Sequence, residues 1–235
     1  MRLLVSVRDG REAEDAIGAG ADLVDVKDPG AGALGALDPA AIRAILGVVA
    51  GRRPVSATTG DLAPEPARLC AAAERIAATG VDFVKVGLWP GPRRAEAIAR
   101  LGAALSGRTR LVGVLLADAG ADVALLPRLA EAGFAGAMLD CAQKGPSLPQ
   151  RLGPAVLARF VAETRAQGLT AGLAGSLDVA DIARLALLRP DILGFRGGLC
   201  VGRDRTGPLD PAAVRRAAGE IEAAARATAV PVPAF

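Results

Sequence analysis

The sequence of 235 residues contains no histidine, the side chain that most often serves as a general base in enzymes. This absence excludes Ser-His-Asp triads and histidine-ligated metals. Proton transfer must then use Lys, Asp, Glu, Cys or Ser side chains. We expect no metal site.

Aromatic residues are also few, and the excess of positive over negative charge is small. The chain has one Trp, five Phe and no Tyr, and its formal net charge is +3. Nucleic-acid binding needs a basic run or a platform of aromatic side chains, and the sequence offers neither. A modest basic excess suits small acidic or phosphorylated substrates better.

The three cysteines, at positions 70, 141 and 200, lack the spacing of metal ligands. Their odd number argues against a disulfide framework and fits a reducing cytosol. The apolar run at the N-terminus is too short for a signal peptide, and no segment approaches 18 apolar residues. We therefore expect a soluble cytoplasmic protein with no membrane partner, and homo-oligomerisation is left open.

Eight short apolar runs alternate with alanine-rich stretches whose composition favours helices. We expect helices of about 10 to 15 residues, and two of them have clear start signals at Asp38-Pro39 and Asp210-Pro211. The expected strands are residues 3–7, 23–27, 54–58, 83–88, 111–117, 136–140, 170–175 and 192–197.

Eight strands, each followed by a helix, predict a single-domain TIM-like (β/α)8 barrel over residues 1–235. No linker or change of composition divides the chain. A doubly wound sheet is the main alternative, but eight evenly spaced units favour closure.

Lysine is rare in this chain. Only three of the 28 basic side chains are lysines: Lys27, Lys85 and Lys144. Arginine evidently supplies the surface charge of this chain. A lysine amine can lose its proton and form a Schiff base, which a guanidinium cannot do. The three lysines are therefore candidates for chemistry.

The expected strands place these lysines near one another. Lys27 ends the second strand, Lys85 lies in the fourth, and Lys144 follows the sixth, which ends in Asp140. Inward side chains of alternate barrel strands share a layer, and active sites lie at the carboxyl ends of the strands. Lys27, Lys85 and Asp140 can thus converge at the barrel mouth.

Asp25 precedes Lys27 by two residues, so both side chains point to the same face of an extended strand. Two neighbouring ammonium groups, partly buried, disfavour charge on each other, and one amine then becomes nucleophilic. We interpret Asp25 as a buried carboxylate that supports the Lys27 amine. The alternative is that the lysines form structural ion pairs.

Two glycine-rich turns are candidates for phosphate binding. Gly175 and Ser176 follow the seventh strand, and Gly197 and Gly198 follow the eighth, where TIM barrels often bind phosphate. Arg196 is a candidate cation beside them. The loop at residues 28–35 either holds a second anion or is a flexible connection.

The motifs LLVSV, GADLVDVKDPGAGALG, GVDFVKVGL, MLDCAQKG, AGSL and PDILGFRGGLCVGRDR resemble, in this order, those of the (5-formylfuran-3-yl)methyl phosphate synthase family. The resemblance implies a TIM-like barrel that condenses two glyceraldehyde 3-phosphate molecules with loss of one phosphate and two waters. The family makes the furan precursor of methanofuran in methanogens and of methylofuran in methylotrophic bacteria. The Ala- and Arg-rich composition is similar to that of a bacterial member.

By position, Lys27 matches the family's Schiff-base lysine and Lys85 its proton acceptor. Asp25, Asp140 and Lys144 match the charged residues around them. Archaeal members carry a further lysine near the end of the fifth strand, where this chain has Asp118. The implied mechanism needs no cofactor, because an iminium on Lys27 serves as the electron sink.

Two other functions fit the same residues. A class I aldolase-type lyase of a sugar phosphate would share the Schiff base but release no inorganic phosphate. A non-enzymatic barrel that binds phosphorylated metabolites would need the charge but not the amines, which arginine could supply as well.

Overall fold

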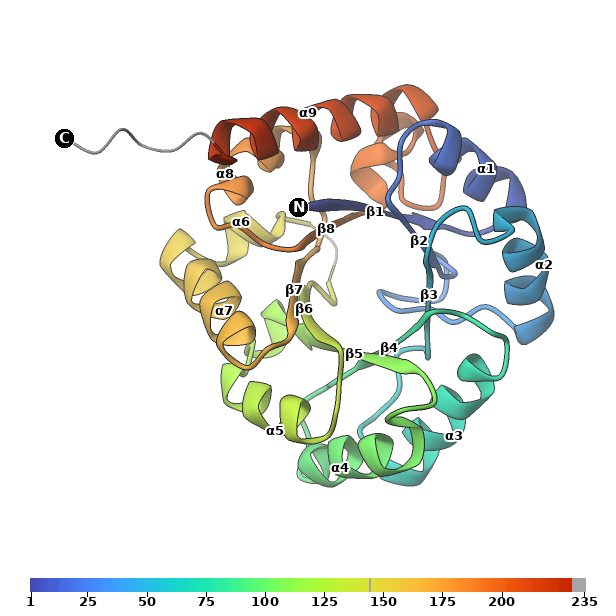
Figure 1. Cartoon of the computed structure of the whole chain (residues 1–235), viewed down its shortest axis with the longest axis vertical. Helices are drawn as coiled ribbons and strands as arrows, with labels where there is room; N and C mark the ends of the chain where they lie inside the picture. Colours follow the sequence, from blue (N-terminus) through green and yellow to red (C-terminus); the bar gives the residue numbers. More distant parts are fainter. Residues whose placement is uncertain (144, 230–235) are drawn as a thin grey trace.

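Eight parallel strands close into a barrel in sequence order, and β8 pairs with β1 (Figure 1). A computed structural model of the chain describes residues 1–143 and 145–229. The strands are β1 (Arg2–Val7), β2 (Leu23–Val26), β3 (Val55–Thr58), β4 (Phe83–Gly87), β5 (Arg110–Leu116), β6 (Gly136–Asp140), β7 (Thr170–Leu173) and β8 (Ile192–Phe195). The expected (β/α)8 barrel is confirmed, and closure excludes the doubly wound sheet.

Helices surround the barrel as an outer ring (Figure 1). They are α1 (Gly10–Gly18), α2 (Pro39–Val49), α3 (Pro66–Ala77), α4 (Arg94–Leu105), α5 (Leu126–Glu131), α6 (Leu148–Arg151), α7 (Pro154–Ala166), α8 (Ile182–Ala186) and α9 (Pro211–Ala229). Asp38 accepts hydrogen bonds from the N–H groups of Ala40 and Ala41, and Asp210 accepts one from Ala212. Both expected N-caps are therefore confirmed.

The strands begin and end within two residues of the expected positions, and the larger differences lie at the carboxyl ends of β7 and β8. There the chain leaves the sheet early, since Gly175 has φ +106° and Arg196 has φ −138° with ψ −79°. The expected helix length is wrong for α9, which has 19 residues, and for α5 and α8, which have only six and five. The two short helices follow 3-10 turns, η2 (Val123–Leu125) and η3 (Val179–Asp181), which take up part of each connection.

The side chains of each strand alternate between two environments, as the two-residue period of a strand requires. Val24, Val26, Val84 and Val86 are fully buried in the cluster that joins the strands to the helices. Burial of each such side chain contributes about 1.5–3 kcal/mol. The residues between them, including Lys85, face the barrel interior.

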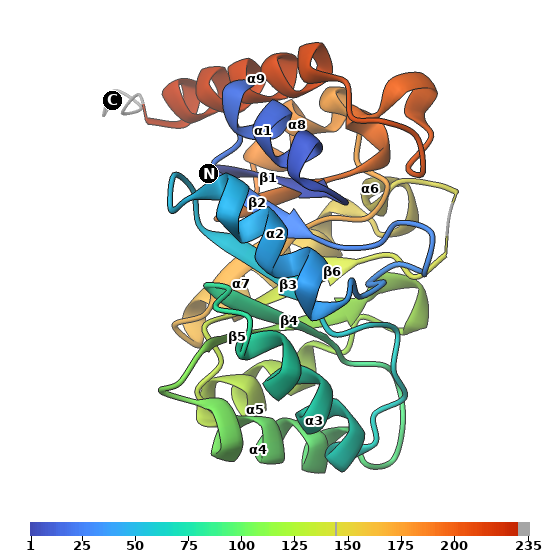
Figure 2. The same cartoon turned by 90° about the vertical axis from the view of Figure 1, so that its right-hand side faces the viewer.

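The loops that follow β2, β6 and β8 project from the same end of the barrel (Figure 2). This is the end to which all eight parallel strands point, so residues far apart in the sequence meet there. In the part of the chain that the structure describes, no helix is both long and apolar enough to cross a membrane.

Candidate active site

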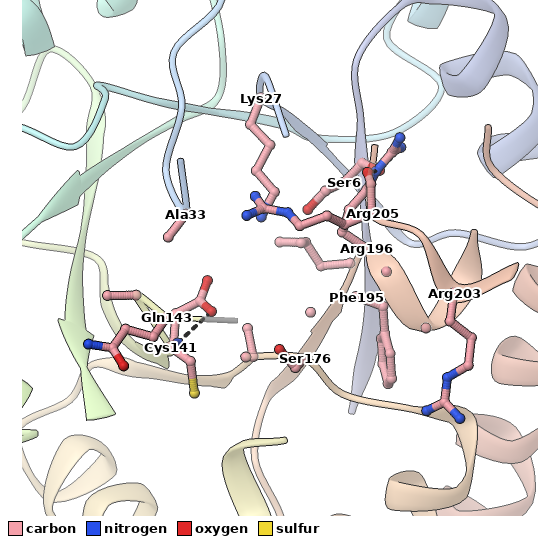
Figure 3. A pocket seen from close by; sticks show the side chains of 18 of the residues that line it. Ser6, Lys27, Ala33, Cys141, Gln143, Ser176, Phe195, Arg196, Arg203 and Arg205 are labelled. Atoms are coloured by element: carbon pink, nitrogen blue, oxygen red, sulfur yellow. Dashed lines mark hydrogen bonds between the residues drawn. The ribbon is translucent and has the colours of Figure 1, made fainter. Parts of the chain in front are cut away.

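A cavity of about 330 Å³ lies at the carboxyl ends of the strands (Figure 3). It brings together most of the residues singled out in the sequence, from strands β2, β4 and β6 and from the loops after β7 and β8. Its polar lining includes Ser6, Lys27, Lys85, Asp140, Gln143, Ser176, Arg196, Arg203, Asp204 and Arg205, together with the glycines at 145, 175, 194, 197 and 198. Lys144 lies outside the described residues.

Asp25 is fully buried at the centre of a hydrogen-bond network that spans four strands. Ser6 on β1 and Ser56 on β3 are its register partners, and their hydroxyls donate to its carboxylate at 2.9 and 2.6 Å. The Lys85 ammonium on β4 donates to Asp25 Oδ1 at 3.1 Å. Ser6 and Ser56 are not among the predicted site residues, and the signal for them in the sequence is one serine within each of the apolar strands that flank β2.

The carboxylate of Asp25 is held in its ionised form. Burial raises its pKa, but the charges of Lys85 and Lys27 and the hydrogen bonds from Ser56 and Lys85 together outweigh burial, so the pKa of Asp25 lies below its ordinary value. The sequence predicts that Asp25 supports Lys27. In the structure Asp25 accepts a hydrogen bond from Lys85 instead, because Lys27 lies one residue beyond the end of β2 and its side chain extends into the cavity (Figure 3).

Lys27 is 7% exposed and reaches into the cavity. Burial lowers the pKa of its amine, the charges of Asp140 and Asp25 oppose this, and those of Lys85 and Arg205 add to the lowering. The net effect is a pKa below the ordinary value. Such an amine loses its proton more readily than a surface lysine, as a nucleophile requires.

Asp140 ends β6 and faces the cavity with 7% exposure. Its Oδ1 accepts a hydrogen bond from the N–H of Cys141 at 2.7 Å, which fixes the carboxylate against the start of the next loop. Burial and the charge of Asp140 raise the pKa of the Cys141 thiol to about 12. The thiol of Cys141 therefore stays protonated and is not a nucleophile at neutral pH.

Asp118 holds the loop that follows β6. Its carboxylate accepts hydrogen bonds from the N–H groups of Ala142 and Gln143 at 2.8 and 2.6 Å. Burial opposes its charge, but these backbone bonds outweigh burial and keep the pKa of Asp118 below its ordinary value. Arg151 donates to the carbonyls of Gln143 and Pro146, so the loop is held on both sides of position 144.

The glycine-rich turns after β7 and β8 line one wall of the cavity. Gly175 has φ +106°, and a Cβ there would lie 2.6 Å from the Cys141 sulfur. A Cβ at Gly198 would lie 2.2 Å from the carbonyl oxygen of Leu177. Both positions thus require glycine, because the two turns pack closely against neighbouring backbone.

Arg196 lines the cavity but differs from the expected free cation. Its guanidinium forms a buried ion pair with Glu12 of α1, and Nη2 lies 3.1 Å from Glu12 Oε1. It also donates to the carbonyls of Ser6, Arg205 and Gly207 at 3.1, 2.8 and 2.9 Å. These bonds occupy the guanidinium, so we correct its expected role from phosphate ligand to structural anchor.

The loop at residues 28–35 has its own partners. The Asp61 carboxylate accepts hydrogen bonds from the N–H groups of Ala33 and Leu34 at 2.8 and 3.1 Å. The Thr58 hydroxyl donates to the carbonyl of Gly35 at 2.9 Å. Because a carboxylate already takes these N–H groups, they do not provide the second anion site that the sequence left open.

Comparisons with known proteins agree with this geometry. A family model described as 4-HFC-P synthase matches residues 3–218. A Methanocaldococcus jannaschii protein named (5-formylfuran-3-yl)methyl phosphate synthase is 38% identical over 217 residues, covering 87% of this chain and 92% of the relative. A Methylorubrum extorquens protein, which bears that name with a provisional qualifier, is 48% identical over 229 residues and covers 97% of this chain and 94% of the relative.

The chain belongs to the (5-formylfuran-3-yl)methyl phosphate synthase family. It is therefore an enzyme, and the family resemblance noted in its motifs is confirmed. The binding-only barrel is correspondingly disfavoured.

Solved structures share the fold. A 3-hexulose-6-phosphate synthase from Salmonella typhimurium has a TM-score of 0.68 at 14% identity, covering 95% of this chain and 100% of that one. A phosphoribosyl anthranilate isomerase from Thermus thermophilus has a TM-score of 0.66 at 17% identity, covering 95% and 99%. At these identities the likeness concerns the barrel alone.

Proposed function

We propose that the chain condenses two molecules of glyceraldehyde 3-phosphate into (5-formylfuran-3-yl)methyl phosphate through a Schiff base on Lys27. The names of its relatives supply the product. The observation that carries the mechanism is the buried Lys27 amine in the cavity, whose pKa is lowered, beside a second lysine held by a carboxylate. A lysine with these surroundings forms an iminium with a carbonyl compound.

The Lys27 amine attacks the carbonyl carbon of one triose phosphate, and water leaves as the iminium forms. Lys85 starts as the ammonium bound to Asp25 and gives the proton that this water needs. As a neutral amine, Lys85 then takes the proton from the carbon next to the iminium, and the electron pair of that C–H bond forms the enamine.

The enamine carbon attacks the aldehyde of the second triose phosphate and forms the new carbon–carbon bond. Elimination of one phosphate, ring closure and dehydration follow, and hydrolysis of the iminium frees Lys27. Over the whole reaction two triose phosphates become one furan phosphate, one inorganic phosphate and two waters. The aromatic ring makes the sequence effectively irreversible.

The turns at Gly175–Ser176 and Gly197–Gly198 are the proposed site for one substrate phosphate. Their close backbone packing and their place on the cavity wall support this assignment. Asp140 and Lys144 are proposed to assist the later proton transfers. The greater identity to the Methylorubrum extorquens relative than to the Methanocaldococcus jannaschii relative, 48% against 38%, favours methylofuran biosynthesis as the pathway.

The test is to incubate the purified protein with glyceraldehyde 3-phosphate and identify the product by mass spectrometry and NMR. We expect the furan phosphate, one inorganic phosphate per product, and no loss of activity in EDTA. Borohydride added during turnover should leave a triose adduct on Lys27, and Lys27→Arg should leave none.

Each other outcome has a distinct meaning. A six-carbon bisphosphate without phosphate release would identify an aldolase. Absence of both product and adduct would refute the proposed reaction, and an adduct confined to Lys85 would exchange the two lysine roles.

A further inference from the structure

The cations around the cavity differ in whether a carboxylate already neutralises them. Lys85 is paired with Asp25, and Arg196 is paired with Glu12. Arg203 is paired with Asp178. Arg205 lines the same cavity, and within the described residues no carboxylate lies in ion-pair distance of its guanidinium. Its charge is therefore available to an anion in the cavity.

Arg205 is held in place at both ends. Its carbonyl oxygen accepts a hydrogen bond from Arg196 Nε at 2.8 Å, so the Glu12–Arg196 pair anchors its backbone. Its Nη2 donates to the carbonyl oxygen of Gly32, in the loop after β2, at 2.6 Å. A side chain fixed in this way loses little conformational entropy when it binds a ligand.

The guanidinium of Arg205 also lies close to the proposed nucleophile. Figure 3 shows it reaching toward the end of the Lys27 side chain. Its charge disfavours the charged form of that amine, which is consistent with a short separation. An anion bound by Arg205 would thus lie beside the reacting carbon atoms.

We propose that Arg205 forms a second anion site in this cavity and binds the phosphate of the second triose phosphate. This inference rests on the proposed function, in which two phosphorylated substrates meet in one cavity. The first phosphate lies at the turns of Gly175–Ser176 and Gly197–Gly198, and the second is held by Arg205. With Nη2 on Gly32, the guanidinium keeps further N–H donors for a phosphate, to which arginine bonds in a bidentate manner.

The test compares Arg205→Gln, which removes the charge, with Arg205→Lys, which keeps it but loses the fork of donors. Arg203→Gln is the matched control, because Arg203 lines the same cavity but is already paired with Asp178. Two measurements are made on each folded variant: calorimetric titration with inorganic phosphate, and product formation against glyceraldehyde 3-phosphate concentration.

We expect two phosphates bound per wild-type chain and one per Arg205→Gln chain. Loss of charge-assisted hydrogen bonds should lower kcat/KM of Arg205→Gln by about 10- to 100-fold. Arg205→Lys should bind the second phosphate more weakly than the wild type. Arg203→Gln should still bind two and lose less than about threefold in kcat/KM. The adduct on Lys27 should still form in all three variants.

Other results would overturn the inference. The inference is wrong if Arg205→Gln still binds two phosphates, if the wild type binds only one, or if Arg205→Gln binds none. An equal loss of kcat/KM in Arg203→Gln would do the same. The phosphate titration is independent of catalysis. If the wild type made no furan but bound two phosphates, and Arg205→Gln bound one, the proposed reaction would be refuted and the proposed anion site would be supported.

Discussion

Two sides of the cavity use positive charge in different ways. The lysine side consists of Asp25 on β2, Lys27 directly after that strand, and Lys85 on β4. The arginine side consists of Arg196 and Arg205 in the loop after β8 and of Glu12 on α1. Each side contains a buried ion pair, Lys85–Asp25 and Arg196–Glu12, whose side chains are at most 5% exposed.

The two pairs differ in the group that carries the positive charge. A lysine amine can serve as a proton donor and acceptor, whereas an arginine guanidinium stays charged. Arg196 also bonds three carbonyl groups, so it joins α1 and β1 to the loop that carries Arg205. We infer that the lysine pair serves proton transfer and that the arginine pair serves architecture.

The largest effect should come from replacing Lys27 by arginine, which would make the lysine side chemically like the arginine side. Lys27→Arg keeps the charge but cannot form an iminium, so the borohydride adduct and product formation should both disappear. Circular dichroism should show a folded barrel, since the site lies at the open end. Near-normal turnover by folded Lys27→Arg would refute the Schiff-base mechanism.

The lowered pKa of Lys27 also has a consequence for stability. Between the folded-state pKa and the ordinary value of 10.5, the unfolded chain binds more protons at this lysine than the folded chain does. Lys27 therefore lowers the free energy of unfolding at neutral pH, and stability rises as pH increases through this window. Lys27→Met should abolish activity while raising the midpoint of urea unfolding.

Replacing Lys85 by arginine should have the next largest effect. Lys85→Arg keeps a cation beside Asp25 but removes a proton donor and acceptor, so turnover should fall by about 10² to 10⁴. Trapping should still detect some adduct on Lys27, because the nucleophile is intact. Complete loss of the Lys27 adduct in folded Lys85→Arg would exchange the roles of the two lysines.

On the arginine side the main effect should be on stability. Glu12→Gln leaves the buried Arg196 charge unpaired, which should lower the free energy of unfolding by about 3–5 kcal/mol. Chemical denaturation measures this, with Glu14→Gln as the control, because Glu14 on the same helix pairs with Arg52 in solvent and should change stability little.

Asp25→Asn distinguishes the two pairs directly. Both Asp25→Asn and Glu12→Gln leave a buried cation without its carboxylate, so both should be less stable than the wild type. Only Asp25→Asn should also impair iminium chemistry at temperatures where the protein is folded. If folded Glu12→Gln lost as much of the Lys27 adduct as Asp25→Asn does, the proposed contrast between the lysine side and the arginine side would be wrong.

Much of the lysine side could be predicted from the sequence, because a strand's two-residue period determines which side chains face the barrel interior. The alternation around Lys85 placed it inside, and the eight runs gave strand limits within two residues. The partner of Asp25 could not be predicted. Both candidates are lysines of equal length, so the partner depends on position: Lys85 lies within β4, whereas Lys27 lies one residue beyond the end of β2.

The arginine side was largely inaccessible to sequence reasoning. Arg196 and Glu12 are 184 positions apart, and no local pattern links a residue of α1 to a loop after β8. A free cation and a paired one look alike in a sequence, so the sequence predicts a phosphate ligand at Arg196, which is paired with Glu12, and does not single out Arg205. The GRDR run at residues 202–205 lies in the same loop, and nothing in its sequence shows that Arg203 is paired with Asp178 whereas Arg205 is not.

The smallest expected effect concerns Asp118, which touches the cavity only through the loop after β6. Asp118→Ala removes the acceptor for the N–H groups of Ala142 and Gln143, so this loop should sample other positions. Loss of hydrogen bonds to a charged group should reduce kcat by about tenfold. Asp118→Asn keeps one acceptor oxygen and should lose less.

The pH dependence distinguishes this role from a general loss of stability. Because the folded-state pKa of Asp118 is lowered, its contribution to stability is complete above the ordinary value of 3.8 and is lost as pH falls through the folded-state pKa. At neutral pH the carboxylate is ionised, so the activity of the wild type should not vary with the titration of Asp118. If Asp118→Ala lowers kcat at pH 7 without changing the unfolding midpoint, and Asp118→Asn restores part of that kcat, the loss of activity is due to the position of the loop. Equal kcat in Asp118→Ala and the wild type would show that the hydrogen bonds from Arg151 suffice to hold the loop.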